Sequence, residues 1–269
     1  MVSAGCSRQA ELSEPAQPKE NPASGPDPRA AGTSRKPIRM VQTLDGPRLA
    51  PKSGKARQLI IILHGYGANG DDLIEIGRQW QPLFPDAAFI APHAHEPCAQ
   101  APGMRQWYNL TDRNPHERWA GAAAARSVVD AFIDSELEQL RLDDSQLALA
   151  GFSQGAMMAL HIGLRRRSAP AAILGYSGML VGPEYLSEAT ARDTAGAPPP
   201  VLLIHGSHDE VVPPQSLFTS ANQLAEANIP CQWHLSIGLG HGIDHEGIRQ
   251  GACFLAKSMG MPTPNLARR

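Results

Sequence analysis

A serine flanked by glycines, Gly151-Phe-Ser-Gln-Gly155, restricts the possible folds of this chain more than any other stretch. An apolar run at 147–150 with β character leads into it, and a helical run at 156–167 follows. Strand, tight turn and helix in this order are the context of a nucleophile elbow. Strand and helix nearly touch at such a turn, so glycine is required two residues on either side of Ser153. The turn then holds the Ser153 hydroxyl up at the carboxyl edge of a sheet.

Apolar, β-branched runs alternate with helical patterns along most of the chain, which favours the elbow over a chance match in a glycine-rich sequence. This alternation predicts an α/β fold with a mostly parallel central sheet and helices on both faces. Right-handed crossovers place the loops that follow the strands on one sheet edge. The strand patterns cover 38–44, 59–63, 87–91, 147–150, 171–176, 201–204 and 231–237, and the later helices cover 119–141, 156–167 and 245–259.

Local signals also indicate where several elements begin or end. Gly46-Pro47 ends the first strand pattern. Asp71 and Asp72 open the helix after the second strand, where aspartate caps free N–H groups. The run Arg165-Arg-Arg167 is expected to be a solvated helix end, because cations there complement the helix dipole.

Three segments differ in composition. Residues 1–37 are rich in Pro, Ser, Ala and charge, and they contain too little apolar surface to offset their chain entropy, so we expect disorder there. Residues 38–260 form the predicted α/β-hydrolase domain, and residues 261–269 form a flexible tail. An inert N-terminal segment is favoured over a functional one, because termini are often untethered.

Charge and cysteine content exclude several functional classes. The net charge is −2, so no basic excess points to nucleic acid or to an anionic membrane. No apolar run is long enough for a transmembrane helix, and no secretory signal precedes the domain. Four dispersed cysteines without a C-x-x-C motif are typical of free thiols in a reducing compartment, so we expect a cytoplasmic protein.

A serine hydroxyl needs a histidine to accept its proton and a carboxylate to orient that histidine. Ser153, Asp209 and His241 each follow a predicted strand, in the chain order of an α/β-hydrolase. The sequence therefore predicts a Ser153–His241–Asp209 triad at the carboxyl edge of the sheet. The weaker candidates are His208, which is too close to the acid loop, His245, which falls within the last helix, and Glu210.

The tetrahedral intermediate of acyl transfer needs two donors for its oxyanion. One is predicted to be the backbone N–H of Gln154, at the start of the helix after the elbow. The other is the backbone N–H of Tyr66, in the glycine-rich turn His64-Gly-Tyr-Gly67.

A long polar loop at 92–118 contains Arg105, Trp107 and Tyr108, which either line a pocket or cover the domain surface. His93 and His95 in this loop could bind a metal, but no third ligand stands at a suitable spacing. We therefore do not expect these histidines to bind a metal.

Four ordered motifs carry a family resemblance: Leu63-His-Gly-Tyr-Gly67, Gly151-Phe-Ser-Gln-Gly-Ala156, His205-Gly-Ser-His-Asp-Glu-Val-Val-Pro213 and Gly240-His-Gly242. Over residues 38–260 the chain resembles the phospholipase/carboxylesterase family, which includes acyl-protein thioesterases. The resemblance implies a serine esterase of broad acyl-ester or thioester scope, with no metal and no organic cofactor. It also implies that Trp107 and Tyr108 shape the substrate groove. Tyr66 stands where the family commonly has leucine, which keeps the backbone donor but changes the pocket.

Only 24 residues, 177–200, separate two strands where many lipases insert a cap, so no large cap domain is expected. An open site favours soluble substrates with short-to-medium acyl chains over buried lipid. The expected substrate is a small-molecule acyl ester, with thioesters and lysophospholipids as further candidates. We expect a monomer or a homodimer without stable membrane insertion. The same triad could also serve a peptidase, a lactonase or an acyltransferase. A non-enzymatic interaction protein on a hydrolase scaffold is the alternative of another class.

Overall fold

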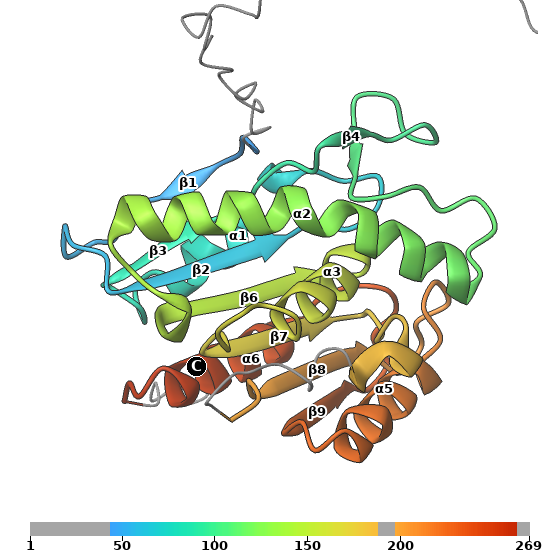
Figure 1. Ribbon diagram of the computed structural model, residues 1–269. Helices are drawn as coiled ribbons and strands as arrows, with labels where there is room; N and C mark the ends of the chain where they lie inside the picture. Colours follow the sequence, from blue (N-terminus) through green and yellow to red (C-terminus); the bar gives the residue numbers. More distant parts are fainter. Residues whose placement is uncertain (1–43, 188–196, 263–269) are drawn as a thin grey trace, which may run out of the picture. The chain divides into compact units, whose positions relative to one another are not determined.

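The computed structural model describes residues 44–187 and 197–262, which contain a seven-stranded sheet (Figure 1). The predicted disordered segment 1–37 and most of the predicted tail lie outside these ranges. The strand order is β1-β3-β2-β6-β7-β8-β9, and every neighbouring pair is parallel except β1 with β3. The strands are β1 (Arg48–Leu49), β2 (Gln58–Leu63), β3 (Ala87–Ile90), β6 (Leu147–Phe152), β7 (Ala172–Tyr176), β8 (Val201–Gly206) and β9 (Cys231–Ser236).

The helices cover both faces of the sheet, as predicted. They are α1 (Gly70–Trp80), α2 (Pro115–Leu140), α3 (Gln154–Gly163), α5 (Gln215–Glu226) and α6 (His245–Ser258), with short 3₁₀ turns at Asp144–Gln146 and Pro183–Tyr185. One apolar core joins the sheet to α2, α3 and α5, and a second core joins the other face to α1 and α6. In Figure 1, α2 and α3 lie in front of the strands and α1 lies behind them.

Strand β2 shows why continuous apolar runs form the centre of this sheet. Leu59, Ile61 and Leu63 enter the first core, whereas Ile60 and Ile62 enter the second. Successive side chains of a strand point to opposite faces, so a strand covered on both sides must be apolar throughout. Its neighbour β6 pairs in register, with Leu63 opposite Gly151, and this places the turn after β2 beside the elbow.

The N-terminus of α1 refines the sequence prediction for its cap. Asn69 is the N-cap residue, and its side chain accepts the N–H of Asp71 at 2.8 Å. The Asp72 carboxylate accepts the N–H of Asn69 at 3.0 Å in return. The two aspartates therefore open the helix as expected, within a capping box that Asn69 completes.

Three expectations need correction. The edge strand β1 forms after Gly46-Pro47 instead of ending there, while residues 38–43 lie outside the described ranges. The loop expected at 92–118 contains a two-stranded hairpin, β4 (Glu96–Pro97) with β5 (Arg105–Gln106), and α2 begins within it at Pro115. The run Arg165-Arg-Arg167 was expected to be solvated at a helix end, but Arg165 and Arg166 are buried and only Arg167 is exposed.

No helix in the described ranges is long and apolar enough to cross a membrane. Three cysteines fall within these ranges, Cys98, Cys231 and Cys253, and all three are free thiols.

Candidate active site

The elbow places Ser153 in a strained backbone conformation between β6 and α3. Its φ is 54° and its ψ is −116°, and its N–H donates to the carbonyl of Tyr176 at 2.8 Å. A Cβ at position 151 would lie 2.2 Å from the carbonyl oxygen of Gly155, and one at 155 would lie 2.0 Å from that of Leu63. Both glycines are therefore required by backbone contacts, as the motif predicted.

Asp209 lies in the turn after β8, and both oxygens of its carboxylate have hydrogen-bond partners. Oδ1 accepts the N–H groups of Val211 and Val212, each at 2.9 Å. Oδ2 faces Nδ1 of His241 at 2.8 Å. Burial of Asp209 opposes ionisation, but the hydrogen bonds from His241 and the two valine N–H groups outweigh it and lower the pKa of the carboxyl. The carboxylate is thus held ionised beside the histidine.

His241 lies in the loop after β9, and three contacts fix this loop. The N–H of His208 donates to the carbonyl of Leu239 at 2.8 Å, and the N–H of Gly238 donates to Oγ of Ser207 at 2.8 Å. Oγ of Ser177, at the end of β7, donates to the carbonyl of Gly242 at 3.2 Å. A carboxylate only accepts hydrogen bonds, so Nδ1 of His241 carries the proton and Nε2 is the basic nitrogen.

The elbow and the histidine loop meet through Phe152. The Phe152 and His241 rings are tilted by 44°, with centroids 4.8 Å apart. Phe152 is the residue before Ser153, so the imidazole lies over the elbow. The Ser153 hydroxyl makes no hydrogen bond to a residue in the described ranges. Hydrogen bonds of this kind often form only in the substrate complex.

The side chains of His208 and His245 form no hydrogen bond or ion pair with Asp209, and that of Glu210 forms none with His241. Nδ1 of His208 lies 3.0 Å from Oγ of Ser207, His245 begins α6 and Glu210 is exposed. The structure instead adds His205, which was not among the sequence candidates. Its Nε2 donates to the carbonyl of Val212 at 2.9 Å and lies 3.2 Å from Oδ2 of Asp209. His205 thus braces the acid turn. The available signal was its position at the end of a buried strand, four residues before the acid.

The predicted oxyanion donors flank the elbow. Gln154 is the first residue of α3, where backbone N–H groups have no partner within the helix. The N–H of Tyr66 has no acceptor among the described residues. A Cβ on the neighbouring Gly65 would lie 3.4 Å from Cβ of Ser153, so the turn at 64–66 borders the serine.

Trp107 and Tyr108, predicted to contact substrate, are both buried. The indole N–H of Trp107 donates to the carbonyl of His64 at 2.8 Å, and the Tyr108 hydroxyl lies 3.4 Å from Sδ of Met157. These polar groups bond within the protein. Contact of either residue with substrate stays a prediction. Arg105 is exposed on β5, and its carbonyl accepts the N–H of Gly67 at 3.0 Å.

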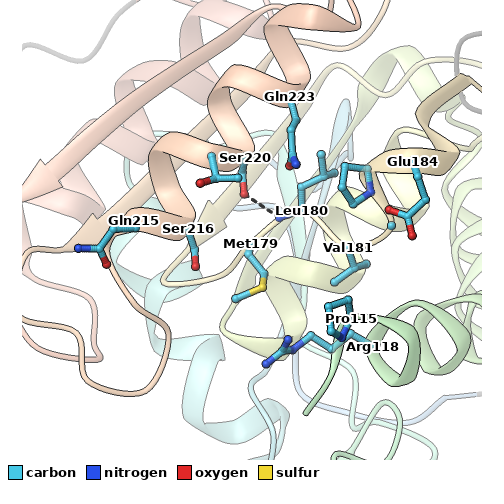
Figure 2. Close-up of a pocket in the computed structure, with 13 residues that line it drawn as sticks. Pro115, Arg118, Met179, Leu180, Val181, Glu184, Gln215, Ser216, Ser220 and Gln223 are labelled. Atoms are coloured by element: carbon cyan, nitrogen blue, oxygen red, sulfur yellow. Dashed lines mark hydrogen bonds between the residues drawn. The ribbon is translucent and has the colours of Figure 1, made fainter.

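A pocket of about 300 Å³ opens between the start of α2, the segment after β7 and α5 (Figure 2). Its apolar wall includes Met179, Leu180 and Val181. The N–H of Leu180 donates to Oγ of Ser220 at 2.9 Å, which ties the segment after β7 to α5. A Cβ on Gly178, the residue before Met179, would lie 3.0 Å from the carbonyl oxygen of Ser153. The wall therefore follows a residue that packs against the elbow, while Ser153, Asp209 and His241 are not among the residues that line the pocket.

The two histidines considered as metal ligands have different contacts. Nδ1 of His93 accepts the N–H of Gly70 at 3.0 Å, and Nε2 of His95 lies 3.7 Å from the Glu96 carboxylate. Within 44–187 and 197–262, no three or more His, Cys, Asp or Glu side chains gather in a way that could hold a metal ion.

A sequence model of the phospholipase/carboxylesterase family matches residues 44–259. The chain belongs to the phospholipase/carboxylesterase family. Esterase YpfH of Escherichia coli K12 is 28% identical, over 78% of this chain and 83% of that protein. Acyl-protein thioesterase 1 of Gibberella zeae is 25% identical, over 79% of this chain and 95% of its own length.

Among solved structures, that of esterase PE8 is 40% identical with a TM-score of 0.75, and the match covers 80% of this chain and 99% of that one. The predictions of the family, of the α/β-hydrolase fold without a large cap, and of a carboxylesterase-type enzyme are therefore confirmed.

Proposed function

We propose that this family member hydrolyses carboxylic esters through Ser153, His241 and Asp209 by way of an acyl-enzyme. The observation that carries the proposal is the 2.8 Å bond between Nδ1 of His241 and Asp209, which leaves Nε2 as a base over the elbow that bears Ser153. Phe152 and Ser177 support the arrangement by packing on His241 and by holding Gly242.

In the first half-reaction, Nε2 of His241 accepts the Ser153 proton while Oγ adds to the ester carbonyl. The N–H groups of Tyr66 and Gln154 donate to the resulting oxyanion. The tetrahedral intermediate collapses, the C–O bond to the alcohol breaks, and His241 gives its proton to the leaving oxygen. Water then adds to the acyl-enzyme with His241 as base, which releases the carboxylic acid and restores Ser153. Asp209 stays ionised throughout and stabilises the imidazolium.

The acyl chain is proposed to enter the pocket along Met179, because this wall follows Gly178, which packs against the carbonyl of Ser153. Its volume of about 300 Å³ is at the lower end of the range for small-molecule sites. This size supports short-to-medium acyl chains. Thioester substrates are proposed as well, on the strength of the relatives named acyl-protein thioesterase.

A series of p-nitrophenyl esters from acetate to palmitate tests the proposal in the wild type and in Ser153→Ala. We expect the highest kcat/KM at short or medium chains, and loss of turnover in the variant. Undiminished turnover in Ser153→Ala would refute the nucleophile assignment, and an optimum at palmitate would refute the short-to-medium pocket. Peptide and lactone substrates in the same assay separate the proposal from other uses of the triad.

A further inference from the structure

Trp107 is buried and bonds through two different atoms to the two sides of the oxyanion site. Its side-chain Nε1–H donates to the carbonyl of His64 at 2.8 Å. Its backbone N–H donates to Oε1 of Gln154 at 3.0 Å. His64 lies two residues before the Tyr66 donor, and Gln154 carries the second donor on its own backbone. One residue thus connects the two segments that supply the oxyanion donors.

On the first side, His64 connects Trp107 to the turn that carries Tyr66. Nδ1 of His64 donates to the carbonyl of Gly65 at 2.7 Å, and Nε2 accepts the N–H of Ala94 at 2.9 Å. The His64 and Trp107 rings pack with centroids 5.2 Å apart. Burial lowers the pKa of His64 to about 4, so the ring is neutral and this pattern of one donor and one acceptor persists at neutral pH.

On the second side, both polar atoms of the Gln154 side chain are bonded to the Trp107 segment. Oε1 accepts the N–H of Trp107, and Nε2 donates to the carbonyl of Tyr108 at 2.7 Å. The residue is almost fully buried. The side-chain amide therefore serves the fold, while the backbone N–H of the same residue serves the proposed oxyanion site.

We propose that Trp107 is a positioning residue that fixes the distance between the Tyr66 and Gln154 N–H donors. The inference rests on the proposed ester hydrolysis and assigns to Trp107 a role other than contact with substrate. Donors for an oxyanion act through preorganisation, so a shift in the relative position of two donors weakens binding of the transition state more than binding of the substrate.

Trp80 offers a matched control for the loss of a buried indole hydrogen bond. It is 1% exposed, and its Nε1–H donates to the carbonyl of Ile248 at 3.0 Å. It belongs to the second core, on the face of the sheet with α1 and α6, whereas Trp107 belongs to the first core. Phenylalanine at either position removes an N–H of the same kind and leaves one buried carbonyl without that donor.

The experiment compares kcat and KM of the wild type, Trp107→Phe and Trp80→Phe on p-nitrophenyl butyrate. We expect Trp107→Phe to lower kcat by about ten-fold or more while KM changes by less than about two-fold. Trp80→Phe should keep the wild-type kcat. Equal values of kcat in the two variants, or a rise in KM that accounts for the loss in Trp107→Phe, would overturn the proposal.

Gln154→Met is the second variant, in case Trp107→Phe does not fold. It removes both side-chain bonds to the Trp107 segment and keeps the backbone N–H. We expect the same loss in kcat, together with weaker inhibition by a trifluoromethyl ketone, whose adduct with Ser153 carries an oxyanion. A wild-type kcat in folded Gln154→Met would contradict the inference. Absence of hydrolysis in the wild type would instead refute the proposed function, so the two failures are distinguishable.

Discussion

The ring of Phe152 packs against the imidazole of His241, with centroids 4.8 Å apart. The two residues are separated by most of the C-terminal half of the chain, yet one precedes the nucleophile and the other is its proposed base. The contact limits rotation of the imidazole ring without using either of its nitrogens, so Nδ1 keeps its bond to Asp209 and Nε2 stays free to act as the base. The orientation of the base therefore depends on packing as well as on its carboxylate.

Phe152→Leu tests this packing. Leucine keeps the apolar volume but loses the flat ring, and an aromatic pair contributes about 0.5–1.5 kcal/mol beyond its buried area. We expect kcat to fall by roughly two- to ten-fold, while the thermal unfolding midpoint falls by only about 2–4 °C. Steady-state kinetics on p-nitrophenyl butyrate measure this kcat. A wild-type kcat in Phe152→Leu would show that Asp209 alone orients His241.

Asp209→Asn removes the charge beside His241 and keeps the size and shape of the side chain nearly unchanged. An amide at this position favours the wrong imidazole tautomer, a change that lowers kcat by about 10⁴ in a serine-protease triad. We expect a loss of this order here. Glu210→Gln, the neighbouring exposed carboxylate, is the control and should retain full activity. A comparable loss in both variants would contradict the assignment of Asp209.

His161 makes the fold sensitive to acid. Burial lowers its pKa to about 3, with the cations of Arg165 and Arg126 adding to the effect, and Nδ1 finds no hydrogen-bond partner among the described residues. The pKa of this histidine is about 6.5 in the unfolded chain and lower in the folded state. Stability that depends on neutral His161 is therefore fully present above about pH 6.5. It is lost as the pH falls from there toward the pKa of the folded state.

Urea unfolding at pH 7 and at pH 5 tests this role of His161. We expect the unfolding free energy to fall more between these pH values in the wild type than in His161→Leu. Between these pH values the unfolded wild type binds a proton at His161 that the folded state does not bind. The wild type should therefore lose about 2 kcal/mol more of its unfolding free energy than the variant. Equal losses in the two proteins would show that His161 does not contribute.

Arg166 is buried at the end of α3 among three carboxylates. It bonds to Asp130 at 3.2 Å, to Asp134 at 2.6 Å and also to Asp144. Replacing it with methionine removes the cation that these carboxylates share, and among the described residues only Asp130 keeps another cationic partner, Arg126 at 2.9 Å. Breaking a buried ion pair in this way costs about 3 kcal/mol. We expect that loss in urea unfolding of Arg166→Met. Arg167→Met, at the exposed neighbour, is the control, and an equal effect of both changes would contradict the ionic role.

The sequence predicted the parts of this fold that depend on local pattern. The run Leu59–Leu63 is apolar at every position because both its faces are covered, and Gly151 and Gly155 are required by backbone contacts within the motif itself. The contact between His241 and Asp209 followed from the parallel sheet, since loops after its strands share one edge.

What the sequence did not predict depends on long-range partners. The run Arg165-Arg-Arg167 resembles a solvated helix end. Its first two residues are buried only because they pack against α2 and the turn at Asp144. Similarly, Trp107 has a pattern typical of a pocket residue, and its bonds to His64 and Gln154 join segments more than 40 residues away in each direction. His205 was not recognised because its position at the end of a buried strand, four residues before Asp209, does not by itself indicate a contact between the two side chains.

Labelling of the wild type with a fluorophosphonate, followed by mass spectrometry of the peptides, tests the central proposal most directly. The proposed triad predicts one phosphonyl group on Ser153, no label in Ser153→Ala, and full labelling of Ser145→Ala, which changes an exposed serine on the 3₁₀ turn before β6. A label on another residue, or an unmodified Ser153 in the folded wild type, would contradict it.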